Sequence, residues 1–273
     1  METAYTHALA ATTHVLVISA ADLATLGVEL ETWLTSRLCL LKEHLEKLPS
    51  DDPLGSPVSL FGTMDYGRLE TAHTRALAWL LGKGEREHGF GFQLLEALLR
   101  HLLHGREIFL SGEIKVEGEH STDVGRIDVL AEGFWHEEGN EVPWRLVIEA
   151  KIDATESDEQ LSHYDDWLDQ HAQPGMHTLR VFLTPNGRTP KTNLVNWQTI
   201  SFVELASVFR CVSGLQDKPG FHFLRYYLTG VLRDVCKMSL DLSSDCKNPY
   251  ATIDYLQAVL NAKSREDSDG LFR

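Results

Sequence analysis

The segment from Arg145 to Ile152 constrains the fold of this chain more than any other, because after Arg145 it places two opposite charges, two residues apart, in an otherwise apolar strand. Its sequence is RLVIEAKI. Side chains alternate between the two faces of a strand, so Val147, Glu149 and Lys151 share one face. A buried charge without a partner costs about 3–5 kcal/mol. A divalent cation on Glu149, with Lys151 facing the same cavity, would provide the missing compensation.

The segment from Gly125 to Leu130, with the sequence GRIDVL, repeats this pattern one strand earlier. Asp128 points away from its apolar neighbours and meets Glu149 if the two strands lie side by side. Two carboxylates and a backbone carbonyl, for which we expect that of Ala150, suit the preference of magnesium for hard oxygen ligands. The sequence therefore predicts a Mg²⁺ site on these strands, with Mn²⁺ as a substitute.

An acidic residue two positions before a lysine is a weak signal when taken alone. It occurs three times in this chain, at 113–115, 149–151 and 245–247. The alternative for Glu149 and Lys151 is a structural ion pair on a solvated face. Only this triplet lies in a strongly apolar strand shortly after another strand-borne aspartate, so its context favours a catalytic role.

The remaining pattern predicts an α/β protein in which a mixed β-sheet is flanked by helices. Helices are expected at 66–81, 92–103, 157–171 and 221–236, and strands at 113–117, 126–131, 145–152, 178–183 and 199–203. Short connections between the first three strands favour antiparallel pairing. The strand–helix–strand unit at 145–183 favours a parallel, right-handed crossover.

Three regions are expected along the chain. Residues 1–60 would form an N-terminal helical extension, with a leucine stripe over 22–47 and a linker at 49–57. Residues 61–240 would form the core domain. Residues 241–273 would add a C-terminal helix and a polar tail.

Charge and composition limit the classes of function. The net charge of −15 counts against a protein that coats nucleic acid without selectivity, since such proteins carry an excess of Lys and Arg. An acidic enzyme can still hold DNA in one local basic groove.

The cysteines lack zinc-finger spacing, so reduced thiols are expected. No apolar run approaches the about 20 residues that span a bilayer, and the stretch 15–21 lacks the basic flank of a secretory signal. We therefore expect a cytoplasmic protein without membrane contact.

These residues resemble the PD-(D/E)XK nuclease superfamily over roughly residues 66–205. The closest likeness is to bacterial members that place a glutamate on an early helix, here the helix ETAHTRALAWLL that begins at Glu70. Ile127 stands where the name of the family has proline, which removes no ligand. The resemblance is carried by Asp128, by Glu149-x-Lys151, by the helix with Gln160 and Tyr164, and by the segments 88–91 and 182–190.

The resemblance implies a restriction-endonuclease-like core, in the order αβββαβ, that hydrolyses phosphodiester bonds of nucleic acid, with DNA as the expected substrate. Asp128, Glu149 and Glu70 would hold one or two magnesium ions. Lys151 would orient the attacking water or help to deprotonate it. Gln160 would contact the scissile phosphate or the nucleophile. For Glu70 the alternative is a structural acid in the first turn of a helix, where the helix dipole favours it.

Three further residues are expected to bind substrate, namely Tyr164, Arg126 and His73. Tyr164 is equally compatible with a place at the edge of the core. For His73 the preferred interpretation is a hydrogen bond that supports Glu70. Arg180 is open to two interpretations, a contact with DNA phosphates and a contribution to surface solubility.

A second functional hypothesis comes from a different class. The chain could be a catalytically silent or partner-dependent binding or regulatory protein on a nuclease scaffold, and the net charge of −15 supports this view. A third hypothesis is a structural subunit that assembles through its N-terminal helix. The family's habits imply a setting in restriction, repair or phage defence, and a homodimer is compatible with cutting two strands.

Overall fold

The chain divides into two compact units, residues 1–46 and residues 47–273. In the first unit the described residues within 24–36 are helical and exposed. No helix in the described parts of the chain has the length and apolar character needed to cross a membrane. The triplet at 245–247 and the expected polar tail lie outside the described residues. The computed structural model describes residues 24–29, 31–33, 36, 48, 52–137, 139–154, 159–191, 196–239, 252 and 255.

The second unit is built on a five-stranded sheet in the order β1-β2-β3-β4-β5. Its strands are β1 (Phe109–Thr122), β2 (Gly125–Glu137), β3 (Asn140–Ala150), β4 (His177–Thr184) and β5 (Gln198–Ser201). The first three strands are antiparallel neighbours, whereas β4 is parallel to β3 and β5 is parallel to β4. The predicted mixed sheet is confirmed, including the crossover between β3 and β4.

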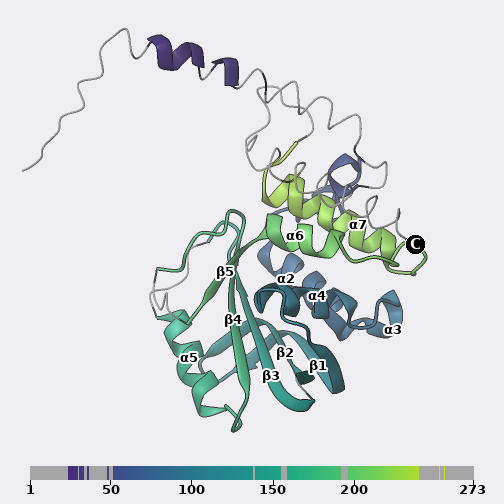
Figure 1. Cartoon of the computed structure of the whole chain (residues 1–273), viewed down its shortest axis with the longest axis vertical. Helices are drawn as coiled ribbons and strands as arrows, with labels where there is room; N and C mark the ends of the chain where they lie inside the picture. Colours follow the sequence, from purple (N-terminus) through teal and green to yellow (C-terminus); the bar gives the residue numbers. More distant parts are fainter. Residues whose placement is uncertain are drawn as a thin grey trace, which may run out of the picture. The chain divides into compact units, whose positions relative to one another are not determined.

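Helices cover both faces of this sheet (Figure 1). One face carries α5, and the other carries α2 and α4, with α6 and α7 beyond them. The α-helices are α2 (Glu70–Ala78), α3 (Glu85–His88), α4 (Gln93–Leu102), α5 (Gln160–Gln170), α6 (Phe202–Arg210) and α7 (Phe221–Gly230). The shorter helical segments are η1 (Pro53–Gly55), η2 (Gly62–Met64), η3 (Trp79–Lys83) and η4 (Val231–Val235).

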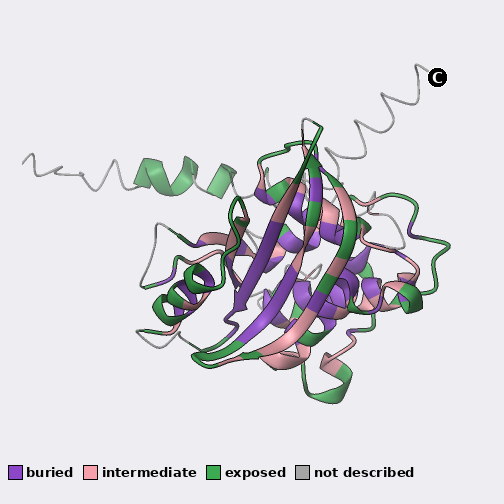
Figure 2. Cartoon of the chain, turned by 90° about the horizontal axis from the view of Figure 1, so that it is seen from below, coloured by how far each residue is buried: buried purple, intermediate pink, exposed green. Residues whose placement is uncertain are grey.

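The centre of the sheet is buried on both faces, as Figure 2 shows for the middle strands. In β3 every residue from Trp144 to Ala150 is buried, and this explains why its sequence is mostly apolar apart from Arg145 and Glu149. On the face that carries α5, one hydrophobic cluster joins β2, β3, β4 and the helix. Its members are Ile127, Leu130, Val147, Leu161, Tyr164, Leu168, Phe182 and Trp197.

On the opposite face, helix α2 lies directly on β1. The position of closest approach is Gly118, where a Cβ atom would lie 3.0 Å from the Cβ of Ala78 and 3.9 Å from the Cα of Arg75. Any larger residue at position 118 would push the helix away from the sheet. The glycine therefore sets the distance between the helix that begins at Glu70 and the strand next to Asp128.

Several boundaries differ from those predicted. The first three strands are longer, because polar residues extend them beyond their apolar segments. Strand β3 ends at Ala150 instead of Ile152, and α2 begins at Glu70 instead of Tyr66. The short helix α3 was not predicted.

The predicted linker at 49–57 is wrong for its described part, residues 52–57. Asp52 and Leu54 are buried. The carboxylate of Asp52 accepts a hydrogen bond from Nε of Arg210 at 2.6 Å, and the hydroxyl of Thr229 donates to the carbonyl of Pro53 at 2.7 Å. Polar and small residues here pack against α6 and α7, where buried hydrogen bonds compensate for their polarity.

Candidate active site

A cleft of about 710 Å³ opens at one end of the sheet, where β2 and β3 meet the first turns of α2 and α5. Three strands, β1, β2 and β3, and the helices α2 and α5 contribute to its wall, together with the turn between β1 and β2. The residues that line it are Glu70, Thr71, Ser121, Thr122, Asp123, Val124, Gly125, Arg126, Asp128, Glu149, Lys151, Gln160, His163 and Tyr164. Seven of the side chains predicted for the site are therefore brought together, since only His73 is missing from this set of described residues.

The cleft begins where the pairing of β2 with β3 stops. The last backbone pair is Val129 with Ile148. At the next residue of β2, a side chain replaces the backbone as hydrogen-bond acceptor. Oδ2 of Asp128 accepts a hydrogen bond from the backbone N–H of Ala150 at 2.8 Å. Asp128 is 6% exposed and Glu149 is 1% exposed. Two carboxylates thus lie side by side at the point where the two strands separate.

Lys151 stands at the centre of the acidic groups. Its ammonium group donates to a carboxylate oxygen of Glu149, to Oε1 of Glu70 at 3.2 Å and to the carbonyl of Ala150 at 3.1 Å. The second oxygen of Glu70 accepts from the backbone N–H of Ile152 at 3.1 Å. Because Glu70 is the first residue of α2, these contacts fix the start of that helix to the end of β3.

A chain of hydrogen bonds joins α5 to both strands. Gln160 donates from Nε2 to Oε1 of Glu149 at 2.7 Å and to the hydroxyl of Tyr164 at 3.1 Å. The hydroxyl of Tyr164 donates to the backbone carbonyl of Arg126 at 2.7 Å. Gly125 permits this approach, since a Cβ atom there would lie 3.3 Å from the ring of Tyr164. The chain orients Glu149 from the side of the helix.

Burial and neighbouring carboxylates raise the pKa of both Asp128 and Glu149. Burial raises the pKa of Asp128 to about 6, against the lowering effect of the N–H of Ala150 and of Lys151. Burial and the neighbouring Asp128 raise the pKa of Glu149 further. For Lys151, burial lowers the pKa, but the surrounding carboxylates outweigh it and keep the ammonium group charged. Three raised pKa values in one cleft, on two buried carboxylates and the lysine between them, are typical of a site that binds a cation or transfers a proton.

The donor set fits a divalent cation. Oε2 of Glu149 is buried and has no hydrogen-bond partner among the described residues. When Glu70, Asp128 and Glu149 are ionised, Lys151 balances one of their charges, so two negative charges remain. All available donors are oxygen atoms, which magnesium prefers. As they stand, no three His, Cys, Asp or Glu side chains of the described residues form a group that could hold a metal ion. Lys151 contacts both Glu70 and Glu149.

A comparison of the sequence with models of known protein families supports the interpretation of this cleft as an active site. The model of a family described as PD-(D/E)XK nuclease superfamily matches residues 59–265, which include every residue of the cleft. The chain belongs to the PD-(D/E)XK nuclease superfamily. Its mixed sheet flanked by helices is the restriction-endonuclease-like fold, and members of the superfamily are nucleases that generally use divalent metal ions. Searches among curated proteins and among solved structures gave no match.

One residue predicted for this PD-(D/E)XK site lies elsewhere. His73 is fully buried behind α2, where its ring packs against Phe61 and Tyr227. Its Nε2 is 3.0 Å from the carbonyl of Gly67, and its Nδ1 has no partner among the described residues. The expected hydrogen bond from His73 to Glu70 is therefore wrong, and His73 has a structural place in the core between α2 and α7.

Arg180, for which the sequence allowed either a contact with DNA phosphates or a contribution to surface solubility, forms ion pairs with acidic residues of α5. Its guanidinium group pairs with Asp165 at 2.7 Å and with Asp169 at 2.9 Å. The side chain of Asp169 is 74% exposed, whereas Asp165 is buried. Because two carboxylates already engage this arginine, it ties β4 to α5 at a distance from the PD-(D/E)XK cleft.

The sequence did not reveal several residues of the cleft. The end of β1 contributes residues 121 and 122, the turn to β2 contributes residues 123 and 124, and α5 contributes His163. Glu119 was missed as well. It lies between Gly118, which pairs with Val129, and His120, which pairs with Ile127, so it stands opposite Asp128 in the sheet. Only the register of two neighbouring strands shows this proximity.

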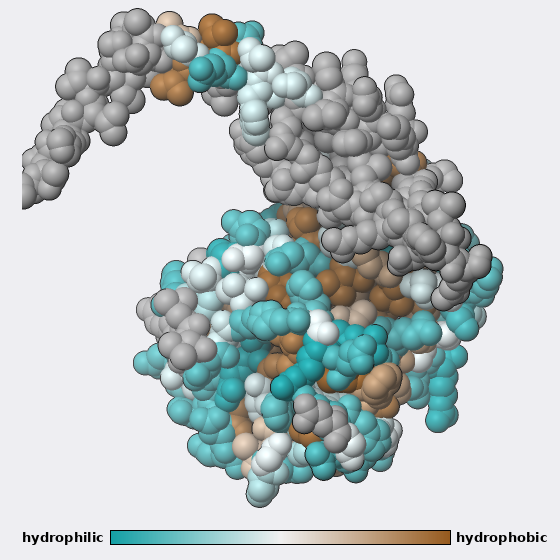
Figure 3. Space-filling model, viewed as in Figure 1, coloured by the Kyte–Doolittle hydropathy of each residue, from teal (hydrophilic) through white to brown (hydrophobic). Residues whose placement is uncertain are grey.

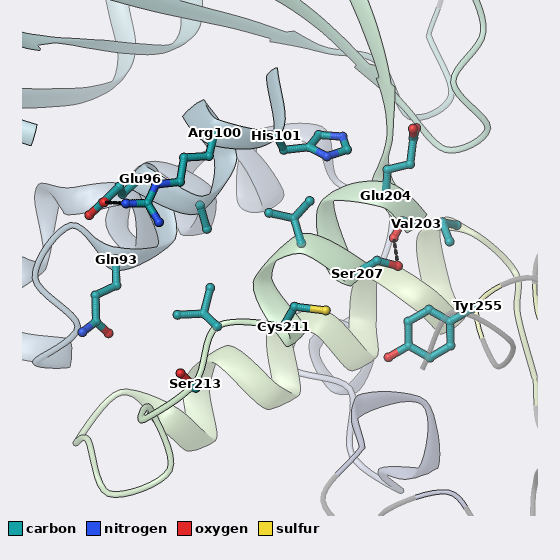
Figure 4. Close-up of a pocket in the computed structure, with 13 residues that line it drawn as sticks. Gln93, Glu96, Arg100, His101, Val203, Glu204, Ser207, Cys211, Ser213 and Tyr255 are labelled. Atoms are coloured by element: carbon teal, nitrogen blue, oxygen red, sulfur yellow. Dashed lines mark hydrogen bonds and ion pairs between the residues drawn. The ribbon is translucent and has the colours of Figure 1, made fainter. Parts of the chain in front are cut away.

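A second cavity, of about 830 Å³, lies between α4 and α6 (Figure 4). Hydrophobic side chains gather on this face of the molecule (Figure 3). Its charged residues Glu96 and Arg100 form an ion pair with each other. The PD-(D/E)XK residues line the first cleft and not this groove, so the first cleft is the candidate active site.

Proposed function

We propose that the chain is a magnesium-dependent nuclease that hydrolyses phosphodiester bonds of DNA, with Asp128, Glu149 and Lys151 at its catalytic centre. The observation that carries this proposal is the buried pair Asp128 and Glu149 beside Lys151, where one oxygen of Glu149 has no hydrogen-bond partner among the described residues. Membership in a superfamily of nucleases supports the same conclusion.

Asp128 and Glu149 would hold the metal ion, with Glu70 and the carbonyl of Ala150 as further oxygen donors. When bound, the ion would supply Lewis-acid activation of water and neutralise charge on the phosphate. Lys151 would orient the attacking water and stabilise the charge that develops on the phosphorus oxygens. Its raised pKa favours these roles over proton abstraction, because an ammonium group that stays charged is a poor base.

The remaining residues of the cleft would position these groups and the substrate. Gln160 holds one oxygen of Glu149 and would direct the other toward the cavity. Tyr164 keeps its proton, since burial raises its pKa to about 12, and it would form the wall against which substrate lies. Arg126, whose side chain is 55% exposed, would contact a phosphate.

A second candidate function is a binding or regulatory protein on the same scaffold, silent or dependent on a partner. The net charge of −15 favours it, because an acidic surface repels nucleic acid over distances of about 10 Å at ordinary salt. The intact set of Asp128, Glu149 and Lys151 argues against it.

The test incubates the purified chain with circular and linear DNA, single- and double-stranded, and with RNA. Mg²⁺, Mn²⁺ or EDTA is added to parallel reactions. The variants are Asp128→Ala and Lys151→Ala. The matched control is Lys115→Ala, which removes the lysine of the acidic-x-Lys triplet at 113–115, whose side chain is 65% exposed.

Cleavage that requires metal, persists in Lys115→Ala and disappears in the two site variants would support the proposal. The products would separate exonuclease from endonuclease action. No cleavage of any substrate, together with no Mg²⁺ binding by calorimetry, would refute it and favour the binding protein. Mg²⁺ binding without cleavage would point to a partner-dependent enzyme.

A further inference from the structure

Glu119 is a carboxylate of the active-site region that the proposed chemistry does not use. It lies opposite Asp128 in the sheet, and its charge contributes to the raised pKa of Asp128. Its backbone has a φ of 60°, in the left-handed region that non-glycine residues rarely adopt. Its side chain is 11% exposed, and Oε1 has no hydrogen-bond partner among the described residues.

The other oxygen of Glu119 holds two arginines from different elements. Oε2 lies 3.1 Å from Nη1 of Arg126 on β2 and 3.4 Å from Nη2 of Arg75 on α2. The side chains of Arg126 and Arg75 are 55% and 67% exposed. Two guanidinium groups on one oxygen atom lie close enough to share one phosphate group. Each carries five N–H donors, and the structure pairs one nitrogen of each with Glu119.

The fold brings these residues together for reasons that can be followed in the sheet. Gly118 allows α2 to lie directly on β1, with Arg75 above the strand. Arg126 is fixed from the other side, because its backbone carbonyl accepts the hydroxyl of Tyr164. Both arginines thus stand beside the cleft, and neither neutralises Asp128 or Glu149.

We propose that Arg75, Glu119 and Arg126 form a phosphate clamp at the mouth of the cleft, in which the two arginines bind the nucleic-acid backbone beside the bond to be cut. Glu119 is the positioning residue that keeps both guanidinium groups at this edge. The proposal rests on the proposed nuclease function. It also resolves the conflict between a net charge of −15 and a polyanionic substrate, since the clamp supplies local positive charge where the substrate enters.

The first experiment measures binding of a short fluorescein-labelled DNA duplex, and of the matching single strand, by anisotropy in EDTA over a series of KCl concentrations. The variants are Arg75→Ala, Arg126→Ala and Glu119→Gln. Arg86→Ala is the control, because it removes the same charge from a side chain that is 91% exposed on α3. Thermal melts establish that each variant is folded.

Replacing either clamp arginine by alanine should weaken DNA binding by about three- to tenfold, as expected for the loss of hydrogen bonds to a charged group. The slope of log K against log salt should become shallower by up to about 0.9 per lost phosphate contact on duplex DNA. Glu119→Gln should weaken binding by about threefold, even though it removes a negative charge, whereas a carboxylate that only repels DNA would give tighter binding when neutralised. Arg86→Ala should leave the salt slope unchanged.

A second experiment uses metal-dependent cleavage, in which Arg75→Ala should raise KM and leave kcat unchanged. Variants Arg75→Ala and Arg126→Ala that bind like Arg86→Ala, or tighter binding by Glu119→Gln, would overturn the clamp. Absence of DNA binding by the wild type would overturn it too. Binding that depends on the clamp in a protein that never cleaves would support the clamp and refute only the proposed nuclease activity.

Discussion

Replacement of Asp128 by asparagine should stabilise the metal-free protein while it abolishes cleavage. Asp128 is buried against Glu149, and its pKa is raised from 3.8 to about 6. Asparagine resembles the protonated form of this residue in shape and charge. Its carbonyl oxygen can still accept the N–H of Ala150, and its amide can donate to Glu149, so the substitution removes a charge and keeps the hydrogen bonds.

The magnitude follows from linkage. Because the folded-state pKa of this acid is raised, the unfolded chain loses the proton first, and stability is lost as pH rises from about 4 to about 6. One pKa unit corresponds to about 1.4 kcal/mol, so the ionised Asp128 costs about 3 kcal/mol above pH 6. At pH 5 the cost is about half as large. For a chain of this size, about 3 kcal/mol corresponds to about 6–12 °C in Tm.

The assay is urea and thermal unfolding of wild type and Asp128→Asn in EDTA, at pH 8 and at pH 5. The matched control is Asp165→Asn, since Asp165 is equally buried but paired with Arg180 at 2.7 Å, and its loss should destabilise the protein. Mg²⁺ should raise the Tm of the wild type and leave that of Asp128→Asn unchanged. A variant no more stable than wild type at pH 8, or a gain that is equal at both pH values, would refute the reasoning.

Three further outcomes are expected. Lys151→Met removes the only ammonium group among the described residues of the cleft. In EDTA at pH 8 it should lower the free energy of unfolding by about 3 kcal/mol, which urea titration measures, and it should abolish cleavage in a gel assay. A variant as stable as the wild type would contradict the central position of Lys151. Gly118→Val would place methyl groups against Ala78 and should lower the free energy of unfolding by about 1–3 kcal/mol. Denaturant unfolding measures this loss, with Gly118→Ala as the milder control. An unchanged midpoint would show that α2 can move away from the sheet without cost. His73→Gln should lower the Tm but leave kcat per folded molecule unchanged, because His73 is buried outside the cleft. A lower kcat in a fully folded variant would show that His73 contributes to the active site.

The central residues of the site could be predicted because they depend on local geometry. The alternation of side chains in a strand is a property of consecutive residues, and it separates Glu149 and Lys151 from their apolar neighbours without knowledge of the fold. The same holds for Asp128. Gln160, in contrast, was predicted from the resemblance to the nuclease superfamily. These residues occupy the cleft as the pattern indicated.

The remaining features depend on contacts between distant parts of the chain. Glu119 stands beside Asp128 only because of the register of β1 with β2, which no local pattern encodes. His73 follows Glu70 by one helical turn, but the packing of α2 against η2 and α7 determines which way its ring points. The strands also continue beyond their apolar segments, since exposed polar residues extend a ladder without leaving a hydrophobic signal.

The position of Lys151 has a consequence for the choice of metal ion. Its ammonium group already contacts Glu149, Glu70 and the carbonyl of Ala150, so an incoming ion competes with a cation that is tethered to the chain and cannot diffuse away. A monovalent ion can only exchange one single charge for another. A divalent ion would bring the three ionised carboxylates and the lysine together to electrical neutrality. We therefore expect Lys151 to make the proposed site select ions by their charge as well as by their size and coordination geometry.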